Sequence, residues 1–289
     1  MRFLINSEKS QACVFRIAFN AVGRCIAIAA SCGILAADEP NPRFASTSSS
    51  QPLNSASVRW PFEFEAGQFR IHSTLPERDL APQVASIIAL PVELHRELGI
   101  DVTSEAIHVV VLESREALDS YVRRMMPNAP SRRALYIRHR GPGLVLTYFH
   151  TAWINDVRHE CTHALLDASN LRLPVWLDEG IAEYFETVGT NRALHASHLS
   201  AIRTQIRYGQ VAELERLEQL DSNATLTAKD YRDSWSIVAL MLNSSEDSRN
   251  AYCEYLKDMQ LQRSAGFLSH RLPRHLNSWR EEYIRFFKQ

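Results

Sequence analysis

Residues 159–163 read His-Glu-Cys-Thr-His, and residues 174–185 read Pro-Val-Trp-Leu-Asp-Glu-Gly-Ile-Ala-Glu-Tyr-Phe. On a helix, residues four apart point about 40° from each other, so the side chains of His159 and His163 project from one face. Two imidazoles on one helical face can share a metal ion. The opposite face carries an apolar stripe that we expect to face the core, formed by Val157, Cys161, Ala164, Leu165 and Ala168. We therefore expect both histidines to lie at a cleft.

A tetrahedral zinc ion held by two histidines needs a third protein ligand and leaves one position open for water. The stretch 176–188 predicts a second helix, which a short preceding loop folds back beside the first. One face of this helix carries Glu179, Glu183 and Glu186. Glu179, next to the small Gly180, is the expected third ligand, and Glu183 is expected to accept the free N–H of a ligand histidine. A solvated acidic face is the alternative for both carboxylates.

The two motifs together resemble the gluzincin zinc metallopeptidases, and most closely the bacterial peptidase MA-like proteins of unknown function. Residues 231–238, Tyr-Arg-Asp-Ser-Trp-Ser-Ile-Val, are similar to a later Tyr-x-x-Ser-Trp-x-x-Val helix of those proteins. The resemblance covers residues 58–289 and is specific between 159 and 185. It implies a zincin-like fold and one zinc ion per chain, with the ligands His159, His163 and Glu179.

The same resemblance implies hydrolysis of a peptide bond. Glu160 borders the histidine face, where it would take the proton of a zinc-bound water and deliver it to the leaving amine. Gluzincins often stabilise the oxyanion with a Tyr or His from a later helix, which favours Tyr231, with His195 and His198 as alternatives. No amine-capturing motif is evident, so we expect an endopeptidase.

In gluzincins, a glycine-led edge strand upstream of the metal site pairs with the substrate backbone. This strand maps to residues 143–149 of the present chain, where it begins with Gly143, Leu144, Val145 and Leu146. Strand addition of this kind recognises the backbone of an extended peptide independently of its side chains.

Strand patterns precede helix patterns along the chain, which predicts an α+β fold. A small antiparallel or mixed sheet would be followed by a mainly helical lobe, with the active-site helix at their junction. The first residues are basic and precede a short apolar run, a pattern typical of a secretory signal or an N-terminal anchor. The expected segments are this signal or anchor at 1–37, a flexible linker at 38–57, a β-rich lobe at 58–150 and a helical lobe at 151–289.

Local patterns predict the individual elements. Alternating apolar residues on both sides of Ala66-Gly67 predict a hairpin, and the β-branched run at 106–112 predicts a central strand. Pro91 is expected to kink or divide a helix, and Ser114 to cap the next one. Two more strands are expected at 134–137 and 144–149, and further helices at 151–169, 176–188, 194–207, 230–243, 246–262 and 276–288.

The 289 residues include 32 Lys and Arg against 33 Asp and Glu, for a net charge of −1. This balance argues against a globally basic nucleic-acid binder, and no platform of interleaved aromatic residues is evident. Six arginines between 123 and 140 indicate either attraction for acidic substrates and envelope polymers or a solvated loop. After residue 37 the only cysteines are Cys161 and Cys253. We expect Cys161 to be a free buried thiol.

The leading hypothesis is an exported zinc-dependent peptidase, bacterial in type, that is periplasmic, secreted or anchored to the membrane by its N-terminal segment. Its partner would be a peptide or protein substrate, and not a nucleic acid. The alternative is a catalytically inactive peptidase-like module that binds peptides or cell-envelope partners. Two further alternatives are a zinc hydrolase acting on another bond and a structural helical protein with an accidental motif.

Overall fold

A computed structural model describes residues 59–138, 141–189, 192–194, 196–222, 224–272 and 279–288. The predicted signal or anchor at 1–37 and the predicted linker at 38–57 lie outside these residues. Within the described residues, all five strands precede Trp153 and the chain after it is helical, which confirms the α+β fold. None of the described helices is long and apolar enough to cross a membrane.

A mixed five-stranded sheet has the order β1-β2-β3-β5-β4. Strands β2, β3 and β5 run parallel, while β1 and β4 pair antiparallel with β2 and β5. The predicted hairpin and the predicted central strand β3 are both confirmed. The strand bounds are β1 Phe62–Ala66, β2 Phe69–Ser73, β3 Ile107–Leu112, β4 Ala134–Ile137 and β5 Leu144–Tyr148.

The expected substrate edge strand is not at an edge, which corrects the sequence-based assignment. Strand β5, which contains Leu144, Val145 and Leu146, lies between β3 and β4, so both of its sides are paired. The reason is that the four-residue strand β4 folds back onto the side of β5 that would otherwise be open. Gly143 has a packing role instead, because a Cβ there would lie 3.0 Å from Cε2 of Tyr136.

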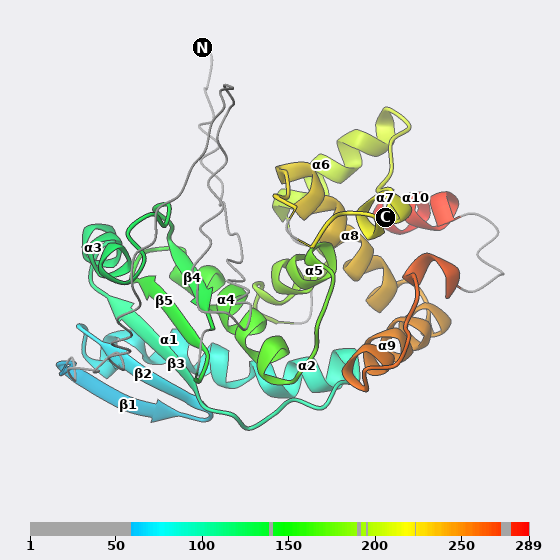
Figure 1. The fold of residues 1–289 in the computed structure, drawn as a ribbon. Helices are drawn as coiled ribbons and strands as arrows, with labels where there is room; N and C mark the ends of the chain where they lie inside the picture. Colours follow the sequence, from blue (N-terminus) through cyan, green and yellow to red (C-terminus); the bar gives the residue numbers. More distant parts are fainter. Residues whose placement is uncertain are drawn as a thin grey trace, which may run out of the picture.

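Helices cover both faces of the sheet (Figure 1). Val109 and Val111 of β3 belong to the large core that includes α1 and α2, whereas Val110 packs with α3 in a smaller core. This alternation follows from the two-residue period of a strand. Pro91 lies in the first turn of α2, where its missing N–H costs nothing, and Ser114 caps α3 as predicted. The helix bounds are α1 Glu77–Ile88, α2 Leu90–Leu98 and α3 Arg115–Met125.

The remaining helices follow the predicted segments closely, with the short α7 as an addition. They form the right-hand part of the molecule in Figure 1, with α4 against the sheet. One continuous core joins them to the sheet. Their bounds are α4 Trp153–Ala168, α5 Val175–Phe185, α6 Ala196–Arg207, α7 Leu214–Glu218, α8 Ala228–Asn243, α9 Glu246–Gln260 and α10 Trp279–Lys288.

Helices α4 and α5 are buried on nearly all sides. Helix α5 packs between α4 and α8, and all its residues from Trp176 to Phe185 are buried. His159 and His163 are only 2% and 1% exposed. The expected apolar stripe of α4 does face the core. The expectation that the histidines lie at a cleft is wrong, because α5 covers the face from which they project. Cys161 is a free buried thiol, as expected.

Gly180 allows α5 and α8 to approach closely. A Cβ at this position would lie 2.8 Å from the backbone oxygen of Ser234 and 2.9 Å from its carbonyl carbon. Real Cβ atoms do not come this close to backbone, so any side chain at 180 would push the two helices apart. The glycine thereby sets the depth at which its neighbour Glu179 is held.

We expect Gly180→Ala to lower the free energy of unfolding by about 1–3 kcal/mol, because the added methyl group overpacks a helix contact that cannot relax through a side chain. Chemical denaturation followed by circular dichroism measures this change. Ser234→Ala is the matched control and should be nearly neutral. The prediction would be contradicted if the double variant Gly180→Ala/Ser234→Ala were as stable as the parent protein. That result would show that the clash is with the Ser234 side chain and not with its backbone.

Candidate metal centre

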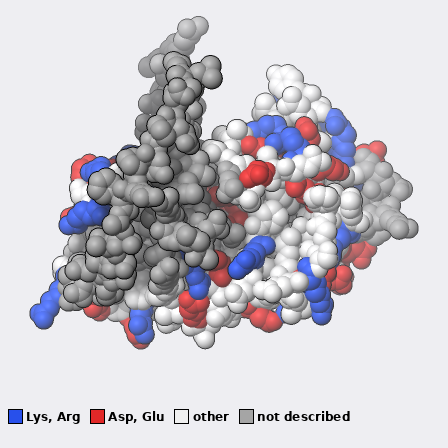
Figure 2. All heavy atoms as spheres, viewed as in Figure 1, with Lys and Arg blue, Asp and Glu red and all other residues white. Residues whose placement is uncertain are grey.

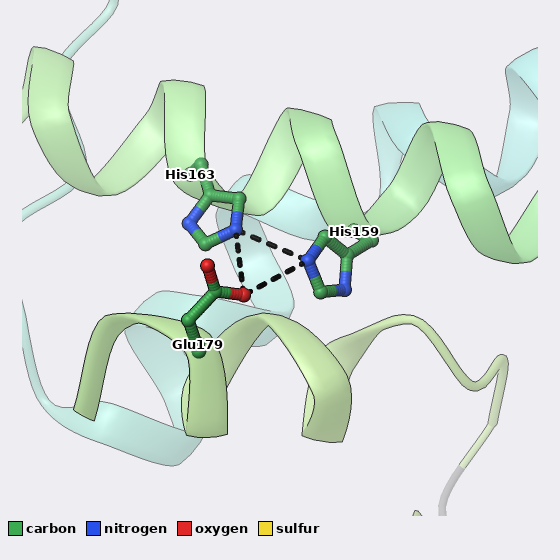
Figure 3. Close-up of side chains that lie close together, drawn as sticks. All are labelled: His159, His163 and Glu179. Carbon is green, nitrogen blue, oxygen red and sulfur yellow. Dashed lines mark hydrogen bonds and ion pairs between the residues drawn. The ribbon is translucent and has the colours of Figure 1, made fainter. Parts of the chain in front are cut away.

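Three side chains from two helices converge on one point inside the core. His159 and His163 point from α4 toward Glu179 of α5 (Figure 3). The Nε2 atoms of the two histidines are 3.1 Å apart. Oε2 of Glu179 lies 3.4 Å from Nε2 of His159 and 3.6 Å from Nε2 of His163. This buried group could hold a metal ion.

The spacing of the three atoms fits a small tetrahedral cation. Ligand bonds of about 2.0–2.1 Å at tetrahedral angles place the ligand atoms roughly 3.3 Å apart. The three observed separations, between 3.1 and 3.6 Å, lie on both sides of that value. A donor set of two imidazoles and one carboxylate matches the three-ligand sites that leave a fourth position for water. The residues present therefore fit the zinc ion that the sequence predicts.

The outer nitrogens of both histidines face acids. Nδ1 of His159 lies 3.3 Å from Oε2 of Glu186, and Nδ1 of His163 lies 3.4 Å from Oδ2 of Asp178. Carboxylates at these positions favour the tautomer with the proton on Nδ1, which we assign from this network. Both Nε2 lone pairs then point at the Glu179 oxygen. Three lone pairs that meet in a buried space repel one another unless protons or a cation lie between them.

Glu183 lies near His159, with a carboxylate oxygen within 4.8 Å of one of its ring nitrogens, but its close partner is another histidine. Its Oε2 is 2.7 Å from Nε2 of His198 in α6, so it pairs with a histidine outside the ligand set. Asp178 and Glu186 instead approach the ligand histidines. Their roles were missed because they depend on how α5 crosses α4, although Glu186 does share the predicted acidic face with Glu179.

The acids outnumber the imidazoles at this centre, and their negative charge shifts the pKa values of both histidines upward. Burial would lower the pKa of His159, but contacts with Glu179 and Glu186 raise it well above its ordinary value. Burial opposes the charged form of His163 as well, yet Asp178 and Glu179 raise its pKa to about 9. Burial would raise the pKa of Glu179, but the two histidines lower it to about 2. A divalent cation would supply the same positive charge in place of the protons.

Glu160 lies beside the three ligand atoms and is not one of them. The backbone N–H of Tyr136 in β4 faces its side chain closely enough to lower its pKa, while Oε2 has no hydrogen-bond partner among the described residues. Burial raises its pKa, an effect that His159 and His163 partly offset. A buried carboxylate with a raised pKa next to a metal position has the properties of a general base that later returns its proton.

A buried ionic cluster fixes the two helices at the His159 end. Arg158 donates Nε to the carbonyl oxygen of Phe185, the last residue of α5, at 3.0 Å. Its Nη2 atom donates to Glu93 of α2 at 2.7 Å, and Arg192 contacts the same carboxylate at 2.7 Å. Because Arg158 precedes His159 and Phe185 precedes Glu186, these bonds align the histidine with the acid that faces it.

The candidate oxyanion donors named from the sequence lie in different surroundings. Tyr231 lies half-buried in the first turn of α8, three residues before Ser234, whose backbone packs against Gly180. Its role stays a prediction. His198 binds Glu183, and its ring lies 5.2 Å from that of Trp235. His195 lies outside the described residues.

The predicted basic cluster is partly neutralised within the protein. Arg133 pairs with Asp156, and Arg138 pairs with Glu105, while Arg140 lies outside the described residues. Figure 2 shows basic and acidic side chains interspersed over the described part of the visible face. These pairs favour the interpretation of the cluster as structural rather than as a site that attracts anions.

The sequence matches no protein-family model, and no curated protein matches it.

We expect Glu186→Gln and Asp178→Asn each to weaken the binding of a divalent metal ion about 10–100-fold, because each removes the charge that orients a ligand histidine. Glu183→Gln should leave the affinity nearly unchanged, since its partner is His198. Competition with a fluorescent chelator measures the metal affinity of each of the three variants. A larger loss for Glu183→Gln than for Glu186→Gln would overturn this assignment and restore the sequence-based one.

Proposed function

We propose that the protein is a zinc-dependent peptidase with a zincin-like active site. The observation that carries the proposal is the convergence of His159, His163 and Glu179 on one buried point, with the carboxylate of Glu160 beside it. The ligand spacing supports a small tetrahedral ion, and the two-histidine, one-glutamate set is characteristic of catalytic zinc sites in peptidases.

Each residue has a distinct part in the proposed hydrolysis. A zinc ion held by His159, His163 and Glu179 would lower the pKa of a water molecule and polarise the scissile carbonyl. Glu160 takes the proton of the attacking water through its Oε2 atom and passes it to the leaving amine. Asp178 and Glu186 keep the histidines in the tautomer that directs Nε2 inward.

Strand β4 replaces β5 as the proposed substrate strand. Because the N–H of Tyr136 points to Glu160 on α4, it points away from β5. In an antiparallel pair, residues two apart point their backbone groups the same way, so those of Ala134 also face the open side. An extended peptide that pairs with this side would lie beside Glu160.

The oxyanion donor and the cellular location are further parts of the proposal. Tyr231 is the candidate donor, supported by its place on the α8 segment that packs against α5 next to Glu179. Export from the cytoplasm is supported by the basic and apolar N-terminal sequence. The proposed substrate is a peptide or protein in extended form, cleaved internally.

One observation favours the alternative of a peptide-binding module without catalysis. The three ligands and Glu160 are each at most 2% exposed. A centre this enclosed could bind zinc and a partner without turnover. The two functions separate in one experiment, because only the peptidase hydrolyses an unstructured protein when zinc is bound.

We expect Glu160→Gln to retain one zinc ion per chain and to lower kcat/KM for peptide hydrolysis by about 10²–10⁴-fold, because it removes the proton acceptor and leaves the ligands in place. Metal analysis and cleavage of unfolded casein measure the two effects. Glu218→Gln, which alters a carboxylate that binds Ser269, is the control and should retain activity. Absence of tightly bound metal from the parent protein would refute the proposal, and zinc without hydrolysis would favour the binding module.

A further inference from the structure

A second set of acids on α4 lies outside the metal centre. Asp156 and Asp167 share one face of the helix with Glu160, since positions 0, 4 and 11 fall within about 40° of one another. This face packs against β4 (Figure 1). The general base proposed above is therefore flanked by two carboxylates along the line where helix and edge strand meet.

Asp156 binds the beginning of the edge strand. Arg133, the residue before β4, donates Nη2 to Oδ1 of Asp156 at 2.5 Å. The other carboxylate oxygen lies 3.0 Å from Nε2 of His150, two residues after β5 ends. The Asp156 side chain is 11% exposed and that of Arg133 is 36% exposed, so solvent reaches this ion pair from the arginine side. One helix carboxylate thus binds the chain just before β4 and lies beside the segment that follows β5.

Asp167 binds the other half of the strand. The phenol of Tyr136 donates to Oδ2 of Asp167 at 2.7 Å, and Nη1 of Arg138 lies 3.7 Å from the same oxygen. Arg138 is held in turn by both carboxylate oxygens of Glu105, at 2.9 and 3.0 Å. Tyr136 is 4% exposed, so its ring fills the space between β4 and α4.

The edge strand needs such contacts because its own pairing is small. Strand β4 has four residues and one strand neighbour, and short edge strands open easily. Between its two ends, the backbone N–H of Tyr136 faces the Glu160 carboxylate. A shift of β4 along or away from α4 would therefore move the substrate-pairing edge relative to Glu160.

We propose that Asp156 and Asp167 are positioning residues that clamp β4 to α4 on either side of Glu160. The clamp itself follows from the contacts above, while its consequence for catalysis rests on the proposed peptidase function. It fixes the separation between the backbone of a paired substrate and the carboxylate that handles the proton. Misplacement of this kind affects extended substrates most, because they use the whole edge.

Hydrogen exchange of the zinc-loaded protein tests the clamp without reference to activity. Asp156→Asn, Asp167→Asn and the milder Tyr136→Phe should each increase exchange of the β4 amides by roughly tenfold or more, because each removes a charge-assisted bond that keeps the strand closed. The zinc content should stay at the parental level. Asp258→Asn is the matched control, since Asp258 also pairs with arginine side chains but lies on α9, away from β4. Unchanged exchange in residues 134–137 in all three variants would overturn the clamp.

Kinetics test the consequence for the substrate. The three variants should lower kcat/KM several-fold for long peptides that span β4 and leave the kcat/KM of a short blocked peptide near the parental value. Equal effects on both substrate lengths would overturn the positioning role. If the parent protein shows no hydrolysis at all, the proposed function fails, and the exchange measurement still decides whether the clamp exists.

Discussion

The meeting of two imidazole nitrogens and one carboxylate oxygen in the core is the constraint on which the structure of this region depends. Separations of 3.1 to 3.6 Å place three electron-rich atoms in contact where water does not compensate them. Asp178 and Glu186 lie beside the Nδ1 atoms and favour the orientation in which both Nε2 atoms face inward, where protons or a cation balance the charge of Glu179. A cation between the atoms turns this repulsion into attraction, and the packing of α5 on α4 then becomes favourable.

Holding Glu179 at this depth requires contacts on both sides of α5. On one side, Gly180 lets the backbone of α8 approach, and on the other side Arg158 fixes the last carbonyl of α5 to α4. Arg158 is completely buried, and its charge is balanced by Glu93 of α2. Removing one member of such a cluster leaves an uncompensated charge in the core, which is far more costly than a lost surface pair. The metal position is thus defined by helices that contribute no ligand.

The local part of this arrangement could be predicted from the sequence, and the long-range part could not. Helical periodicity was sufficient to pair His159 with His163, and the short loop before α5 was sufficient to suggest Glu179. The edge strand was misassigned because four residues at 134–137 do not reveal which neighbour they pair with. Glu183 was misassigned for a similar reason, since the acid that meets a histidine depends on the angle between two helices. A cleft was expected where α5 lies. The polar residues on the histidine face of α4 are compatible both with exposure to solvent and with a buried polar centre, and the sequence does not tell these two apart.

In the buried helix α4, the hydrogen bonding of the polar side chains distinguishes structural residues from the candidate functional one. Arg158 and Thr162 are completely buried, yet each is bonded, Arg158 to Glu93 and to backbone carbonyls and Thr162 to the carbonyl of Arg158. Bonds of this kind recover most of the cost of burying polar groups. Around Glu160 the recovery is incomplete, because its Oε2 has no hydrogen-bond partner within the described part of the chain. Polar atoms whose bonding capacity the protein itself leaves unused are the atoms that a ligand, a metal ion or a reacting water is expected to engage.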